Sequence, residues 1–453
     1  MKPTPVIAIF DIGKTNKKFF LFNEQYQIVF ERTVQFSEMV DEDGYACDNL
    51  QQLSAWVMQL IKEIFELEKY TVKAFNFSAY GASFVHIGEE GKPVAPLYNY
   101  LKPFPPALKE QFYNAYGDEM KWSLETASPV LGNLNSGLQL YYLKNKKKNV
   151  FGQIKYSLHL PQFISYLVTE QVYSDITSIG CHTGLWDFDK NKYHDWVTAE
   201  NIQTKLAPVF PSNAVLDITI HSKKVKAGIG LHDSSAALIP YLASFSEPFV
   251  LISTGTWCIS LNPFNHDPLQ VEELKQDCLC YIEFHGHPVK AARIFAGNEH
   301  EQQVKILAQH FNVSVNYYKK IVFDSTLVQS VSPDKAVAET VLHGTVFAKR
   351  KLENFHSYEV AYHQLIYDII QQQKISTSLI LNTRVTRIFV DGGFAKNPVY
   401  MHLLAAAFPA MEVFAASVSQ ATAIGAALAV HPHWNSKPVP GDMIELKYYT
   451  ITK

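Results

Sequence analysis

VIAIF at residues 6–10 runs directly into DIGKTN at residues 11–16, so an apolar run ends in a polar turn that contains a glycine. A second apolar run at residues 19–22 and a strand-like stretch at residues 27–33 follow. Short apolar runs joined by glycine-containing polar turns are typical of β-hairpins. The opening of the chain is therefore predicted to be a β-meander whose first corner is residues 11–16, which we call the first polar turn.

The same pattern returns in the second half of the chain. Residues 249–252 are apolar, residues 253–256 (STGT) form what we call the second polar turn, and residues 257–261 are again strand-like. The glycines of the two turns, Gly13 and Gly255, stand 242 residues apart. Two hairpins at this spacing predict a duplicated unit, and a chance likeness between two hairpins is the alternative.

Strand-like and helical stretches alternate along the chain. Residues 50–67 carry apolar side chains at helical spacing, and residues 74–78 and 84–87 are strand-like. The elements expected later are a long helix at 336–373, a strand at 387–390, a helix at 398–408, a strand at 412–414 and a helix at 421–430. This alternation indicates the α/β fold class. We expect two domains, residues 1–245 and 246–453, with a boundary in the proline-containing stretch before the second hairpin.

Composition excludes several classes of protein. The chain has 453 residues, of which 47% are hydrophobic, so it can fill two ordinary domains and is not disordered. Its formal net charge of -3 argues against a nucleic-acid partner or an anionic membrane surface. Its 5 cysteines do not suggest a disulfide framework, and no apolar run reaches the roughly 20 residues of a membrane helix. We expect a cytoplasmic protein without a signal peptide.

The first polar turn ends in Gly-Lys-Thr, like a Walker P-loop, but Ala8 stands where that motif needs glycine, and a strand follows instead of a helix. A hairpin that binds phosphate is the better interpretation. Gly13 lets backbone N–H groups approach phosphate oxygens, and Asp11 at the strand end can hold Mg²⁺ through water. Polar contacts and a positive charge for phosphate would come from Thr15, Asn16 and Lys18. An ordinary hairpin with a polar turn is the alternative.

Two later segments are rich in small residues. DGGFAKN at residues 391–397 places two glycines between a strand and a helix, where a base or ribose can lie against the backbone. ATAIGAA at residues 421–427 is a helix of small residues, which permits close packing against a neighbour. A tight turn and an ordinary packed helix are the alternatives.

Taken together, the two polar turns and residues 391–397 resemble the phosphate-1, phosphate-2 and adenosine motifs of the sugar kinase, actin and heat-shock ATPase superfamily. Over nearly its full length the chain is similar to the FGGY carbohydrate kinases. GIGLHDSSAA at residues 228–237 resembles the segment that carries the family's catalytic aspartate, in a form most similar to rhamnulokinases. STGTW at residues 253–257 resembles a rhamnulokinase and fuculokinase motif, and SAYGASF at residues 78–84 lies where those families place a sugar-contacting loop.

The resemblance implies an α/β fold of two actin-like (ribonuclease H-like) domains with a central cleft. It implies ATP-dependent phosphorylation of a ketose, with L-rhamnulose expected first, L-fuculose second and a pentulose such as xylulose third. In this reaction Asp233 is the general base and Asp11 binds Mg²⁺. The implied ATP contacts are Gly13, Thr15, Asn16, Lys18, Gly255, Thr256, Gly392, Gly393 and Asn397. The implied sugar contacts are Tyr80, Gly81, His232 and Asp233.

Several alternatives stay open. Asp233 after Gly-x-Gly is also suited to cap a helix, and both roles are compatible. An inactive regulator that binds ATP and sugar is the alternative function, but the presence of both Asp11 and Asp233 favours an active kinase. Lys18 stands where many members carry arginine, and Ser78 and Ala82 replace polar residues common in the sugar loop, which leaves the sugar identity open. A polyol substrate is a further option. The oligomeric state is also open, with a homodimer among the options.

Two segments resemble metal or catalytic sites on weaker grounds. Cys278 and Cys280 precede His285 and His287, which are zinc-type ligands, but a strand across residues 275–284 would place the two pairs on opposite faces. We therefore expect no zinc site there. Residues 296–301 (AGNEHE) fit the capped start of a helix, and contact of residues 298–301 with nucleotide or sugar is left open.

Overall fold

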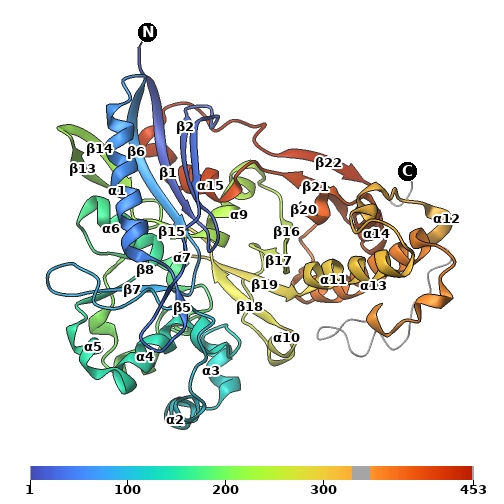
Figure 1. Ribbon diagram of the computed structural model, residues 1–453, viewed down its shortest axis with the longest axis horizontal. Helices are drawn as coiled ribbons and strands as arrows, with labels where there is room; N and C mark the ends of the chain where they lie inside the picture. Colours follow the sequence, from blue (N-terminus) through green and yellow to red (C-terminus); the bar gives the residue numbers. More distant parts are fainter. Residues whose placement is uncertain (1, 329–346, 451–453) are drawn as a thin grey trace. The chain divides into compact units, whose positions relative to one another are not determined.

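The computed structural model describes residues 2–328 and 347–450, and its fold is α/β, as expected (Figure 1). The chain divides into two compact units. Unit 1 comprises Met1–Ser244, Cys280–Pro288 and Ser419–Met443, and unit 2 comprises Phe245–Leu279, Val289–Val418 and Ile444–Lys453. Cys280–Pro288 and Ser419–Met443 therefore pack with unit 1, although both lie within the expected second domain, 246–453. In the described part of the chain, no helix is long and apolar enough to cross a membrane.

The sheet of unit 1 begins with the predicted meander. Its strands are β1 (Thr4–Ile12), β2 (Lys17–Asn23), β3 (Ile28–Val34), β6 (Tyr70–Ala79), β13 (Val215–Ile220), β14 (Lys223–Gly228) and β15 (Leu231–His232). The order is β13-β14-β6-β1-β2-β3, and β15 also pairs with β6. The β1–β2 and β2–β3 pairs are antiparallel, whereas β1 runs parallel to β6.

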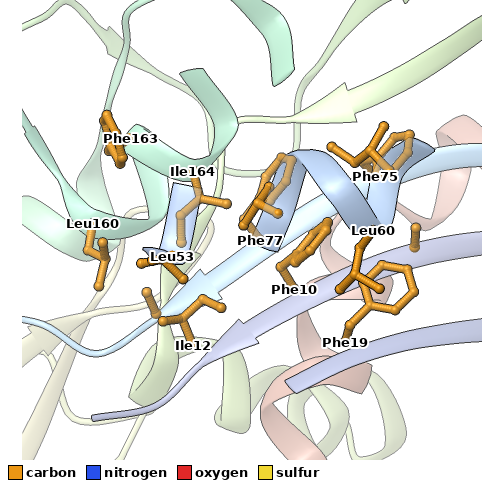
Figure 2. Packing of buried hydrophobic residues seen from close by; sticks show 14 of the residues in the cluster. Phe10, Ile12, Phe19, Leu53, Leu60, Phe75, Phe77, Leu160, Phe163 and Ile164 are labelled. Atoms are coloured by element: carbon orange, nitrogen blue, oxygen red, sulfur yellow. The ribbon is translucent and has the colours of Figure 1, made fainter. Parts of the chain in front are cut away.

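Helices cover both faces of this sheet. On one face, α1 (Leu50–Glu66) and α6 (Leu160–Thr169) contribute to a core that includes Phe10, Phe19 and Phe77 (Figure 2). The helix α1 follows the predicted spacing, with Leu53, Val57 and Leu60 among its buried residues. At its start, Asn49 accepts a hydrogen bond from the N–H of Gln52. This packing supplies most of the stability of an amphipathic helix.

The other face of the sheet is covered by α15 (Ala421–Ala429), which packs on β1 and β6, and by α9 (Asp233–Ser244). Asn76 of β6 donates a hydrogen bond to the carbonyl oxygen of Ala426 at 2.8 Å. A side chain at Gly425 would overlap the backbone oxygen of Ala236, so the two helices lie in backbone contact. The close packing predicted for the small residues of residues 421–427 is confirmed.

The remaining elements of unit 1 are shorter. The helices are α2 (Pro106–Tyr116), α3 (Glu119–Glu125), α4 (Ser136–Lys146), α5 (Lys148–Gln153), α7 (Ile176–Ile179), α8 (Asp195–Ala199) and α16 (His431–Trp434). Paired short strands are β4 (Met39–Val40) with β5 (Ala46–Cys47), β7 (Phe84–Ile87) with β8 (Tyr156–His159), β9 (Ser174–Asp175) with β12 (Val209–Phe210), and β10 (Trp186–Asp187) with β11 (Lys192–Tyr193).

A second seven-stranded sheet repeats the plan of the first. Its strands are β16 (Phe249–Thr254), β17 (Cys258–Asn262), β18 (Cys278–Ile282), β19 (Pro288–Ile294), β20 (Arg387–Gly392), β21 (Glu412–Ser417) and β22 (Glu445–Tyr449). The order is β18-β19-β17-β16-β20-β21-β22. The hairpin β16–β17 is antiparallel and β16 runs parallel to β20, as β1 does to β6. The repeated connectivity confirms a duplicated unit.

Helices of unit 2 include α10 (Val271–Lys275), α11 (Ala296–His310), α12 (Ser325–Val328), α13 (Tyr358–Ile380) and α14 (Pro398–Ala407). The expected helix over 336–373 lies partly outside the described residues, and α13 extends beyond its predicted end. The strand expected at 275–284 is wrong at its start, because Lys275 ends α10 behind a capping box formed by Gln270 and Glu273. The strand that follows, β18, starts only at Cys278.

A buried carboxyl lies between α11 and α13. Glu299 of α11 is 7% exposed. Burial, and next the charge of Asp368 on α13, raise the pKa of Glu299 to about 7, while the backbone N–H of Phe347 acts in the opposite direction. Asp368 is itself bound by the guanidinium of Arg350, at 2.6 Å from Nε to Oδ2. Glu299 is therefore a buried acid whose neutral form suits the fold.

The substitution Glu299→Gln is expected to stabilise the protein above pH 7 and to change its stability little near pH 4.5. The folded pKa of about 7 lies above the ordinary value of 4.5. Protonated Glu299 therefore makes its full contribution to the free energy of unfolding below its pKa in the unfolded chain. That contribution is lost as pH rises through its pKa in the folded protein. Glutamine imitates the protonated acid at every pH, so the gain at pH 8 should be on the order of 1–3 kcal/mol.

Unfolding midpoints of both proteins at pH 4.5 and pH 8 test this expectation. A difference between variant and wild type that is the same at the two pH values would show that ionisation of Glu299 does not affect folding.

Candidate active site

Three loops of unit 1 meet because of one parallel ladder. In the register of β1 with β6, Asp11 lies opposite Ser78, and in that of β15 with β6, His232 lies opposite Ala79. The carboxyl ends of parallel strands share one edge of a sheet, where ligands of open α/β folds usually bind. The first polar turn, residues 80–83 (which we call the acceptor loop) and Asp233 all follow these ends directly.

Two carboxyl groups come together at this edge. Burial, and next the negative charge of Asp233, raise the pKa of Asp11 to about 7, against the lowering effect of Lys18. Asp233 is the first residue of α9, and its Oδ1 accepts a hydrogen bond from the N–H of Ser234 at 2.6 Å. The side chain is 34% exposed. Asp233 is therefore the first residue of the helix, one position after that of a cap, and its carboxylate is part-exposed to solvent beside Asp11.

The first polar turn is closed by its own backbone. The N–H of Gly13 donates to the carbonyl oxygen of Asn16 at 2.9 Å, and Thr15 and Asn16 are exposed. Lys18 follows on β2, where its Nζ donates to Oε1 of Gln420 at 3.0 Å, immediately before α15. Five predicted residues therefore lie close together in the β1–β2 hairpin of unit 1: Asp11, Gly13, Thr15, Asn16 and Lys18.

The acceptor loop packs closely on His232. A Cβ at Gly81 would lie 2.6 Å from Nε2 of His232, so only glycine fits without movement of the ring. The same nitrogen lies 3.3 Å from Oδ1 of Asp233, and the side chain of His232 is 5% exposed. Burial lowers the pKa of His232, so the ring is neutral at neutral pH. The ring contacts Gly81 and Asp233, and the sugar contact expected of His232 stays a prediction.

Tyr80 is also directed to the protein. Its O–H donates to Oδ2 of Asp48 at 2.8 Å, and its backbone N–H donates to the carbonyl oxygen of Ile12 at 3.1 Å. Lys14 of the first polar turn binds the same carboxylate. Neither Lys14 nor Asp48 was among the predicted site residues, and Asp48 stands in no recognisable motif.

The candidate nucleotide site lies within unit 2. A pocket of about 240 Å³ is formed by the second polar turn, the start of α11, residue 318 and the turn before α14. Its lining residues are Thr254, Gly255, Gly297, His300, Tyr318, Gly393, Phe394 and Asn397. The pocket therefore joins Gly255, Gly393 and Asn397 of the predicted set. Thr256 and Gly392 adjoin lining residues in sequence.

Backbone contacts fix this pocket. Oγ1 of Thr254 donates to the carbonyl oxygen of Asp391 at 2.5 Å and accepts from the N–H of Phe394 at 3.0 Å. A side chain at Gly392 would overlap the backbone oxygen of Thr254, and Gly392 has φ 92°. A Cβ at Gly393 would meet nothing within 4 Å. Gly392 is thus required by the tight turn, whereas the space beside Gly393 is not filled by protein atoms.

Aromatic rings form one wall of the pocket. His300 lies with its ring 5.2 Å from Phe394 and 5.0 Å from Tyr318, in edge-to-face geometry. Burial lowers the pKa of His300 to about 4, so this ring is neutral. Asn397 caps α14 by accepting from the N–H of Val399 at 3.1 Å. The wall suits a flat, neutral aromatic group. His300 had been left open by the sequence, and Tyr318 and Phe394 were not predicted.

The zinc-type residues do not gather into a site. Within the described ranges, no group of three or more histidine, cysteine, aspartate or glutamate residues could hold a metal ion. Cys278 and Cys280 are buried in β18. The chain then turns at Glu283, whose carboxylate accepts from the N–H groups of His285 at 2.9 Å and His287 at 3.0 Å. The turn, rather than two strand faces, separates the histidines from the cysteines.

Solved structures of high overall similarity share this fold. A carbohydrate kinase from Novosphingobium aromaticivorans superposes with a TM-score of 0.80 at 20% identity, covering 98% of this chain and 96% of that one. A xylulose kinase from Lactobacillus acidophilus gives 0.78 at 16% identity, covering 98% and 94%. A gluconate kinase from the same organism gives 0.75 at 16% identity, covering 99% and 94%. At these identities the likeness establishes the fold.

Family models cover almost the whole chain. The model of the N-terminal domain of the FGGY family of carbohydrate kinases matches residues 6–239, and the model of the carbohydrate kinase FGGY C-terminal domain matches residues 246–438. Among curated proteins, no sequence matches the chain. The two matched domains, in the order of the two sheets described above, show that the chain belongs to the FGGY family of carbohydrate kinases, which are phosphotransferases.

Proposed function

We propose that this chain transfers the γ-phosphoryl group of ATP to a hydroxyl of a ketose, with Asp233 as the general base. The observation that carries this proposal is the pairing of Asp11 with Asp233 at the carboxyl edge of the β1–β6–β15 ladder, next to the first polar turn. Phosphoryl transfer needs positioning and neutralised charge more than covalent chemistry from the protein. The exposed polar groups of the turn can position phosphate, and the two carboxylates can hold the cation that neutralises its charge.

Asp233 has the geometry of a fixed base. Its Oδ1 accepts from the N–H and, at 3.3 Å, from the hydroxyl of Ser234, and it lies next to His232. Its Oδ2 has no hydrogen-bond partner among the described residues, so this oxygen is available to accept the proton of a sugar hydroxyl within about 2.6–3.2 Å. The contacts at Oδ1 hold the carboxylate in one orientation, which lowers the entropic cost of alignment.

Asp11 fits a magnesium ion that is bound through water. Its carboxylate is partly buried beside a second carboxylate, so its charged form gains from a nearby cation, and oxygen ligands are those that Mg²⁺ prefers. When bound, Mg²⁺ would neutralise charge on the phosphate oxygens. Lys18 supplies a further positive charge, and Gly13, Thr15 and Asn16 supply backbone and side-chain polar groups for phosphate.

The 240 Å³ pocket of unit 2 supports an adenosine site. Its neutral aromatic wall suits adenine, and the backbone around Gly393 is open to a ribose or base. Gly255 and Thr256 in the second polar turn would contact phosphate oxygens, while Gly392, Gly393 and Asn397 would surround the nucleoside. We accordingly assign sugar and phosphate binding and the catalytic carboxylate to residues 1–245, and ATP binding to residues 246–453.

The acceptor is a small-molecule sugar, with L-rhamnulose, L-fuculose and xylulose as the first choices. The His-Asp-Ser sequence at residues 232–234 and STGTW at residues 253–257 support the two deoxyketoses. Solved structures with the same fold include xylulose kinases from three bacteria, which supports the pentulose. The alternative, a regulator that binds both ligands without transfer, predicts a different outcome in the first assay below.

The variant Asp233→Asn should lose at least about a hundredfold of the sugar-dependent turnover, because general-base catalysis contributes about 10²–10⁴-fold. Coupled ADP release with Mg-ATP against a panel of ketoses, aldoses and polyols measures this, and the wild-type protein identifies the sugar in the same experiment. The amide keeps the size of the carboxyl group, so ATP affinity should stay near that of the wild type.

Near wild-type turnover in Asp233→Asn would remove this residue from the base role. A wild-type protein that binds ATP but releases no ADP with any sugar of the panel would instead favour the regulator.

The variant Gly393→Leu should raise the KM for ATP at least about tenfold and leave the fold intact. Gly393 has φ -63° and ψ -46°, values that any residue adopts, and its Cβ would meet no protein atom within 4 Å. A leucine side chain there would therefore occupy the space proposed for the nucleoside.

Gly441→Leu is the matched control, since a Cβ at Gly441 in an exposed turn of unit 1 also meets nothing within 4 Å. Equal ATP kinetics in the two variants would contradict an adenosine site at this pocket.

A further inference from the structure

One buried carboxylate connects two loops of the candidate site. Asp48, which is 9% exposed, lies two residues before α1. Its Oδ2 accepts from the O–H of Tyr80 at 2.8 Å and from the ammonium group of Lys14. Its Oδ1 lies 3.2 Å from the ammonium nitrogen of Lys17. Lys14 and Lys17 belong to the hairpin of the first polar turn, and Tyr80 opens the acceptor loop.

The contacts around Asp48 reach the backbone of the turn. Nζ of Lys17, which is 3% exposed, also donates to the carbonyl oxygen of Lys14 at 2.8 Å. Nζ of Lys14 lies 3.4 Å from Oε1 of Glu38 and 5.7 Å from the ring centre of Tyr80. Hydrogen bonds between charged groups are stronger than neutral ones, and burial increases this difference. The turn is therefore held by its side chains as well as by its own backbone.

Asp48 is itself anchored from outside the site. It forms an isolated β-bridge with Leu97. Five residues further on, Lys102 is 8% exposed and binds Asp41 at 2.6 Å and Asp43 at 2.7 Å. These pairs hold the segment that contains Asp48 against the segment that contains Tyr100. The backbone that carries Asp48 is thus held in place by the bridge to Leu97 and by the ion pairs of Lys102.

We propose that Asp48 is a positioning residue for phosphoryl transfer, which binds Lys14 and Tyr80 together and thereby fixes the acceptor loop relative to the first polar turn. The proposal rests on the proposed function, in which the first polar turn holds phosphate and the acceptor loop lies beside the sugar. In-line transfer depends on the alignment of these two ligands, and a displacement of about 1 Å can cost roughly a hundredfold in rate.

This proposal gives Lys14 and Tyr80 roles that differ from direct ligand contact. Lys14 lies in a phosphate-type turn, yet its ammonium group is bound by Asp48 and Glu38. The hydroxyl of Tyr80 donates to Asp48, so it acts on the sugar through that carboxylate. If instead Tyr80 contacted the sugar independently, the effects of removing Asp48 and the Tyr80 hydroxyl would multiply.

The first test compares Asp48→Asn with Glu200→Gln. Glu200 is a comparable carboxylate of unit 1, since it accepts from a lysine, Lys144 at 2.5 Å, and from a tyrosine, Tyr116, and it is 16% exposed, whereas Asp48 binds two lysines and one tyrosine. Hydrogen–deuterium exchange of the amides of Gly13 and Tyr80 should become at least about tenfold faster in Asp48→Asn. In Glu200→Gln exchange at these two amides should match the wild type.

The second test is kinetic. Asp48→Asn should lower kcat/KM for the sugar at least about tenfold and leave the KM for ATP within about threefold, whereas loss of stability alone would lower the active fraction without this split. In the double variant Asp48→Asn/Tyr80→Phe, kcat/KM should fall no more than about threefold below the lower single variant. The milder variant Lys14→Met should show the same split, and it serves where Asp48→Asn does not fold.

Two results would overturn the proposal: unchanged exchange at Gly13 and Tyr80, or full multiplication of the two single effects. A wild-type protein that phosphorylates no sugar would refute the proposed function instead. In that case the exchange comparison still decides whether Asp48 holds the two loops together.

Discussion

The parallel pairing of β1 with β6, and of β6 with β15, is the constraint on which the candidate active site depends. These strands are held by an apolar core on one face of the sheet and by α15 and α9 on the other. Because their carboxyl ends share one edge, residues more than 200 positions apart in sequence, Asp11 and Asp233, become neighbours. The strand pairing brings the polar groups at these ends together, and the contacts of Asp48 link the two loops that follow.

The second sheet is built on the same constraint. In the register of β16 with β20, Thr254 lies opposite Gly392, and the turns beyond them form the pocket of unit 2. Alignment of the two turn glycines places Ser253 where unit 1 has Asp11. The duplicated hairpin has therefore kept its backbone role while only one copy carries the carboxylate.

The sequence predicted what depends on local pattern and missed what depends on packing. The hairpins and α1 follow from apolar spacing, and the turn glycines follow from their neighbours, so these predictions succeeded. Asp48 and Tyr318 carry no local signal, since each reaches its site only when distant segments pack. The strand predicted before Cys278 failed because a capping box, a local effect that hydrophobic spacing does not detect, starts a short helix there that ends only at Lys275.

The lysines around the first polar turn offset little of the negative charge of Asp11 and Asp233. The segment 14–18 contains three lysines, which together could offset the negative charge of Asp11 and Asp233. Two of them, Lys14 and Lys17, are instead bound by Asp48, and only Lys18 acts on Asp11. Among the described residues of segment 14–18, one lysine therefore faces the charge of two carboxylates. A corner with this balance favours a ligand that brings its own cation, as magnesium-bound ATP does, over a bare anion, which both carboxylates would repel.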